Sequence, residues 1–184
     1  MARVSREDWL ESGLLLLAEE GVEALTIDAM CQRLNVTKGS FYHHFKNRHA
    51  YLDAILAFWE DKYTRQFIDN SLQGLTPAER MARLSEQVIE NYGEYEVKIR
   101  AWAQNDALAR EYQERVDQQR LDFLYSVQND MYDDPKLALT MAQLQYATLI
   151  GSAQMMPALS QNDLAAMYRL LSRFSSSLQS KDGT

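Results

Sequence analysis

The chain has 184 residues and a formal net charge of −7; 46% of its residues are hydrophobic, 24% are charged and one is cysteine. This composition is typical of a globular protein, no apolar run approaches the roughly 18 residues of a membrane span, and a lone cysteine excludes an internal disulfide. Acidic residues precede the LLLL run near the N-terminus, unlike in a secretory signal, so we expect a cytoplasmic protein with no membrane segment.

Positive charge is concentrated in one short part of this acidic chain. Residues 29–52 contain no Asp or Glu, but they hold all three histidines and four cations, namely Arg33, Lys38, Lys46 and Arg48. A binding partner responds to the local field of a surface and not to the total charge. This distribution indicates a basic binding patch for an anionic partner.

The beginning of the chain predicts two helices with recognisable ends. Ser5 and Asp8 have the spacing of a capping box, and the helix that they open should end at Gly21. Thr26 is suited to be the N-cap of a second helix, which should run to about residue 34.

A tight turn and a short third helix should follow. Asn tolerates positive φ, so Asn35 can form a sharp turn between two helices. Thr37 is the expected N-cap of the third helix, which Phe41 and Phe45 should hold by packing. Asn47 can cap a fourth, longer helix that connects this basic part to the rest of the chain.

The remainder of the chain predicts further helices and no strands. Residues 76–79, Thr-Pro-Ala-Glu, combine an N-cap, a proline at the first helical position and a capping box. Asp134 before Pro135 repeats the cap and proline, and Ser160 with Asp163 opens the last helix. The predicted fold class is therefore all-α.

The basic part of the chain has the plan of a DNA reader. A helix, a tight turn and a second helix with an exposed basic N-terminal part is the helix-turn-helix arrangement. Its second helix offers a cation, hydroxyl groups, a ring nitrogen and a glycine that allows close backbone approach, all suited to phosphates and base edges. These residues are Thr37, Lys38, Gly39, Ser40, Tyr42 and His43.

Residues 26–45, TIDAMCQRLNVTKGSFYHHF, resemble the TetR family of bacterial transcriptional regulators, and the likeness extends over about residues 5–56. The resemblance implies a homodimer, usually a repressor, that binds a palindromic operator in double-stranded DNA and is released by an unknown small-molecule effector. It divides the chain into a helix-turn-helix head at 1–50, a connecting helix at 51–72 and a body for ligand binding and dimerisation at 73–184. The last two long helices would form a dimeric four-helix bundle.

The resemblance also assigns roles to single residues of the head. It leaves His44 and Phe45 as a structural pair. The sequence departs from the family pattern at Cys31, Leu34, Asn35, and Arg48 with His49. The residues expected to face DNA are Thr26, Thr37, Lys38, Gly39, Ser40, Tyr42, His43, Lys46 and Arg48.

The body offers candidates for an effector pocket. Aromatic and methionine side chains at helical spacing can line such a pocket, although a stripe of this kind more often forms core. The candidates are Tyr92, Trp102, Met141, Tyr146 and Met155.

Other functions find less support in the sequence. Neighbouring helical residues point about 100° apart, so His43 and His44 converge poorly on one metal ion, and no acid lies near them. Cys31 replaces a small buried residue of the family, which favours an inert thiol over a redox sensor. No nucleophile elbow, phosphate loop or metal-ligand spacing is present, so neither catalysis nor a cofactor is predicted. The alternative is a helical module that binds a protein and no DNA.

Overall fold

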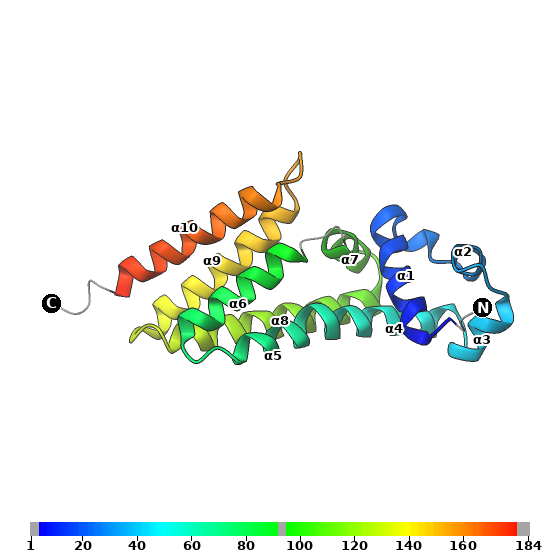
Figure 1. The fold of residues 1–184 in the computed structure, drawn as a ribbon, viewed down its shortest axis with the longest axis horizontal. Helices are drawn as coiled ribbons and strands as arrows, with labels where there is room; N and C mark the ends of the chain where they lie inside the picture. Colours follow the sequence, from blue (N-terminus) through cyan, green and yellow to red (C-terminus); the bar gives the residue numbers. More distant parts are fainter. Residues whose placement is uncertain (1–3, 92–94, 180–184) are drawn as a thin grey trace. The chain divides into compact units, whose positions relative to one another are not determined.

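The computed structural model describes residues 4–91 and 95–179, and every regular element in these ranges is a helix (Figure 1). The prediction of an all-α fold is confirmed. The described residues form two compact units, the first from 4–63 and 95–115 and the second from 64–91 and 116–179. The sequence-based division into head, connecting helix and body stays a prediction. In the described part of the chain, no helix combines the length and apolar character needed to cross a bilayer.

The first unit is organised around its N-terminal helix. Helix α1 packs against α2, α4 and α7, and α2 packs against α3. The elements are α1 (Arg6–Glu20), a 3-10 turn (Val22–Ala24), α2 (Ile27–Arg33), α3 (Lys38–His44), α4 (Arg48–Glu60), α7 (Tyr95–Ala103) and the first part of α8 (Ala107–Asn129).

The helix ends of the first unit follow the predicted caps. The Ser5 hydroxyl accepts from the Asp8 amide at 3.1 Å, and the Asp8 carboxylate accepts from the Ser5 amide at 2.7 Å, which completes the capping box. The Thr26 hydroxyl accepts from the Ala29 amide at 3.1 Å at the start of α2. Thr37 holds the N-cap position of α3, but its side chain makes no capping hydrogen bond.

An aromatic core joins α1, α3 and α4. Trp9 and Phe41 are fully buried, their ring centroids lie 5.5 Å apart, and the rings meet edge to face. The buried Tyr51 donates its hydroxyl to the Trp9 carbonyl at 2.7 Å, and its ring lies 4.8 Å from that of Phe45. A Cβ at Gly13 would collide with the Tyr51 hydroxyl, so glycine permits the close approach of α1 and α4 at this point.

The second unit contains the remaining helices. Helix α6 packs against α5 and α10, and α10 also packs against α9 (Figure 1). The elements are α5 (Gln66–Leu72), α6 (Pro77–Glu90), the second part of α8, α9 (Pro135–Ala153) and α10 (Gln161–Gln179). Between α4 and α5 the chain continues as one π-helical turn, Asp61–Arg65, which the sequence did not predict.

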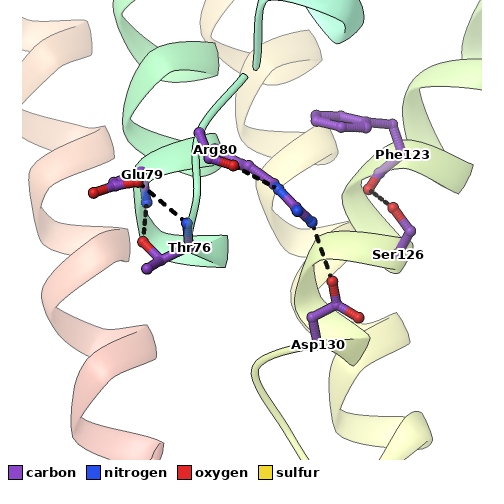
Figure 2. Close-up of polar contacts among 7 residues, drawn as sticks. Thr76, Glu79, Arg80, Phe123, Ser126 and Asp130 are labelled. Atoms are coloured by element: carbon purple, nitrogen blue, oxygen red, sulfur yellow. Dashed lines mark hydrogen bonds and ion pairs between the residues drawn. The ribbon is translucent and has the colours of Figure 1, made fainter. Parts of the chain in front are cut away.

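The start of α6 confirms the N-cap and capping box predicted for residues 76–79. The Thr76 hydroxyl accepts from the Glu79 amide, and the Glu79 carboxylate accepts from the Thr76 amide, both at 3.2 Å (Figure 2). Arg80, one residue further on, donates to the Gly74 carbonyl at 3.1 Å and to the Asp130 carboxylate at 3.3 Å (Figure 2). These contacts fix the loop before α6 to the end of α8.

Candidate nucleic-acid interface

The turn between α2 and α3 is made at the predicted residue. Asn35 has φ of 52°, the left-handed conformation that asparagine tolerates better than other side chains with a Cβ. The Val36 amide then donates to the Cys31 carbonyl at 2.9 Å, which closes the end of α2. Helix α3 begins at Lys38, three residues after the turn.

Helix α3 has one buried side and one exposed side. Phe41 is fully buried and Phe45 is 4% exposed, whereas Tyr42 between them is 57% exposed. Among the residues expected to face DNA, Ser40 and Arg48 are half-buried. The exposed ones are Thr26, Thr37, Lys38, Gly39, Tyr42, His43 and Lys46. The core contacts therefore hold the helix and leave its polar side open to a partner.

The four cations of the basic segment have different surroundings. Arg33 forms a two-bond ion pair with Glu19 at 2.6 and 2.9 Å, and Lys38 pairs with Asp28 at 2.6 Å. Lys46 has no ion-pair or hydrogen-bond partner among the described residues. The absence of Asp and Glu from residues 29–52 did not predict these pairs, because both acids precede that segment in the sequence. The accessible positive charge is consequently smaller than the sequence suggests.

Arg48 is a structural clamp in the folded chain. Its guanidinium donates from Nε to the Leu25 carbonyl at 2.7 Å and from Nη2 to the Val22 carbonyl at 3.0 Å. These half-buried bonds tie the start of α4 to the segment that leads into α2. No local pattern indicates this role, since a basic residue at this position also suits a phosphate contact.

We expect Arg48→Lys to lower the free energy of unfolding of the first unit by about 1–2 kcal/mol. Lysine keeps the charge, but its single ammonium cannot reproduce the fork that reaches two carbonyls. Urea unfolding followed by tryptophan fluorescence measures the loss. Lys46→Gln, at an exposed cation, is the control and should leave stability unchanged. Unchanged stability of Arg48→Lys would show that the clamp is not important for folding.

The histidines and the cysteine have distinct local roles. His44 Nε2 is placed to donate to the Val4 carbonyl at 3.2 Å, and the His43 and His44 rings lie 4.9 Å apart. In the ranges that the structure describes, no group of three His, Cys, Asp or Glu side chains could hold a metal ion. Cys31 is buried, and burial raises the pKa of its thiol, which favours the unreactive protonated form.

The five effector-pocket candidates lie in different surroundings. Met141 and Tyr146 are on α9, in core clusters with Ala138 and Ala142 respectively. The Tyr146 hydroxyl donates to the Asp117 carboxylate at 2.7 Å. Trp102 is buried in the first unit, Met155 is 51% exposed after α9, and Tyr92 lies outside the described residues. Their role in ligand binding stays a prediction.

Part of the chain is similar in sequence to known bacterial regulators. Residues 10–55 match the family described as "Bacterial regulatory proteins, tetR family". The tetracycline repressor protein class D of Escherichia coli is 40% identical over 55 residues, which is 30% of this chain and 25% of that protein. The chain spans less than half the length of the curated relatives that it matches.

Solved structures extend the likeness to nearly the whole chain. A transcriptional regulator from Rhodococcus sp. Rha1 matches with a TM-score of 0.76 and 20% identity, over 92% of this chain and 95% of that one. A protein from Saccharomonospora viridis, described as a regulator and solved in complex with choline, matches with a TM-score of 0.72 and 15% identity, over 92% and 94% of the two chains. These likenesses establish the fold.

Proposed function

The chain belongs to the TetR family of bacterial regulatory proteins through residues 10–55, and on this premise we propose that it is a cytoplasmic transcriptional repressor that binds a palindromic operator as a homodimer. A small-molecule effector would release it from DNA. The observation that carries the proposal is the presentation of α3, whose Phe41 is fully buried while the next residue, Tyr42, is 57% exposed. A helix fixed by its core side can insert its polar side into the major groove.

Selection from a pool of random DNA duplexes tests the proposed DNA binding. The purified full-length chain should enrich sequences with two inverted half-sites about one helical turn, 10 base pairs, apart, because a two-fold dimer presents two copies of α3. A folded chain that enriches no sequence would contradict this function and favour the alternative of a helical module that binds a protein.

The proposed dimer is supported by apolar side chains on the last two helices. Leu139 and Leu144 of α9 are 41% and 42% exposed, and Leu170 and Phe174 of α10 are 66% and 47% exposed. Leu170 and Phe174 are one helical turn apart, and exposed apolar patches mark interaction surfaces. A second copy of the chain would cover them in a four-helix bundle.

Replacing Leu170 and Phe174 together by Glu should convert the dimer to monomers and weaken operator binding. Four charges per dimer would lose water in the interface, and this costs several kcal/mol. Light scattering at micromolar concentration measures the mass. Leu75→Glu is the matched control, because Leu75 is 89% exposed and lies away from both helices in the sequence. A wild-type chain that is monomeric at this concentration would contradict the dimer.

The proposed effector would bind the second unit and change operator affinity. The choline complex of the Saccharomonospora viridis protein supports a small-molecule site in this fold. A thermal-shift screen should find ligands that raise the melting temperature, since they bind only the folded chain. Coupling of about 1–3 kcal/mol would change operator affinity roughly 5- to 150-fold, and operator must change effector affinity by the same factor. A ligand without this reciprocity is not the effector.

A further inference from the structure

Asp28 is an acid on the side of the molecule that carries the polar residues of α3. It is the second residue of α2 and lies two positions after Thr26, one of the residues expected to face DNA. Its Oδ1 is 2.6 Å from the Lys38 ammonium, and the two side chains are 74% and 62% exposed. The carboxylate therefore engages the only lysine within α3 and stays open to solvent.

This pair matters because the other cations of residues 29–52 are mostly engaged elsewhere. Arg33 is held by Glu19 and Arg48 by two backbone carbonyls, which leaves Lys46 without a partner among the described residues. The Asp28 carboxylate accepts a hydrogen bond from Lys38 and raises the pKa of its ammonium, so the lysine keeps its proton throughout the physiological range. The two side chains thus form an ion pair that is exposed at the surface.

We propose that Asp28 is an affinity-limiting residue of the DNA-binding head, which holds Lys38 in the free protein and weakens binding to any DNA that Lys38 contacts. This inference rests on the proposed function. On arbitrary DNA, phosphates supply nearly all of the attraction, and Asp28 competes with them for Lys38. At an operator, guanine O6 and N7 are further acceptors, which the lysine reaches only after it leaves Asp28.

The ion pair between Asp28 and Lys38 is weak enough for DNA to break. Exposed pairs contribute at most about 1 kcal/mol, so DNA can displace the carboxylate, and removing it should change affinity by about two- to fivefold per head. Non-operator DNA should gain this factor where a phosphate takes up Lys38. Operator DNA should gain at least as much, because Lys38 must also leave Asp28 to reach a base. The ratio of operator to non-operator affinity should therefore not fall.

The test compares Asp28→Asn with Glu23→Gln in the full-length chain. Both substitutions remove one negative charge, and the exposed Glu23 has no ion-pair or hydrogen-bond partner in the described ranges. Binding to an operator duplex and to a scrambled duplex is measured over a salt series. Asp28→Asn should strengthen scrambled binding about two- to fivefold per head and steepen its log–log salt dependence by nearly one unit per head. Glu23→Gln should change the affinity and the salt dependence of scrambled binding much less.

A double substitution isolates the role of the lysine. In a Lys38→Gln background, Asp28→Asn should change binding no more than Glu23→Gln does, because the partner of Asp28 is gone. Equal effects of the two acid substitutions in the wild-type background would overturn the inference, as would an Asp28 effect that persists without Lys38. Selective loss of operator binding in Asp28→Asn would also overturn it, since the carboxylate would then be reading a base.

The outcomes distinguish a failure of this inference from a failure of the proposed function. Wild-type chain that is folded and binds neither duplex contradicts the proposed function and this inference together. Wild-type chain that prefers the operator, with Asp28→Asn and Glu23→Gln alike, contradicts this inference alone. Circular dichroism confirms that the variants are folded, and Asp28→Ser replaces Asp28→Asn if the asparagine variant is not.

Discussion

Replacing Phe41 by Ala should lower the free energy of unfolding of the first unit by about 3–5 kcal/mol, the range for truncating a buried aromatic side chain. Phe41 is fully buried, and its ring lies 5.5 Å from Trp9, 5.4 Å from Phe45 and 5.5 Å from Tyr51. The void left by the substitution would remove contacts with α1 and α4 at once. DNA binding should weaken because α3 loses the side chain that seats it.

The chain offers a direct readout for this loss. All three of its tryptophans, Trp9, Trp59 and Trp102, lie in the first unit, so tryptophan fluorescence during urea unfolding follows that unit. Tyr42→Ala is the matched control, since it truncates the adjacent aromatic of the same helix at a 57% exposed position. It should change stability by less than about 1 kcal/mol. Equal effects of the two substitutions would contradict the seating of α3 through Phe41.

Replacing Arg115 by Met should destabilise the first unit by about 3 kcal/mol. The Arg115 guanidinium donates to both carboxylate oxygens of Glu60 at 2.9 and 2.7 Å, and Glu60 is only 1% exposed. Removing the arginine leaves a buried carboxylate without its main counter-charge. Because the Arg115 side chain itself is 37% exposed, the lower end of the range for broken buried pairs applies.

Two further variants test the cause of this loss. Adding Glu60→Gln to Arg115→Met should restore part of the stability, because the buried negative charge is removed. Glu111→Gln should have little effect, since Glu111 is 73% exposed and lies 3.6 Å from the other side of the same guanidinium. If the double variant is no more stable than Arg115→Met, lost packing and not the buried charge explains the loss.

Local signals explain why much of the head could be predicted. Capping is decided within four residues, so Ser5 with Asp8 and Thr76 with Glu79 marked the starts of α1 and α6 correctly. The turn at Asn35 also depends on one residue and its tolerance of positive φ. These signals needed no knowledge of how the helices pack.

Features that depend on distant residues were not accessible from the sequence. The acids that hold Arg33 and Lys38 lie 14 and 10 positions away on other helices, and the carbonyls that hold Arg48 belong to backbone common to every sequence. The apolar pattern around Asp61–Arg65 predicts one continuous helix. No residue type marks the π-helical turn that the structure has there. Pocket residues could not be told from core, because Met141 and Tyr146 suit both roles.

The salt dependence of DNA binding tests whether the exposed side of α3 and its surroundings bind DNA. Affinity of the full-length chain for a selected operator duplex is measured between about 50 and 200 mM salt, beside the Lys46→Gln variant, whose cation has no partner among the described residues. We expect a steep fall in wild-type affinity with salt and a slope shallower by nearly one unit per head in Lys46→Gln. A folded wild-type chain that binds no duplex at the lowest salt, or a Lys46→Gln variant with unchanged affinity and slope, would contradict DNA binding by this surface.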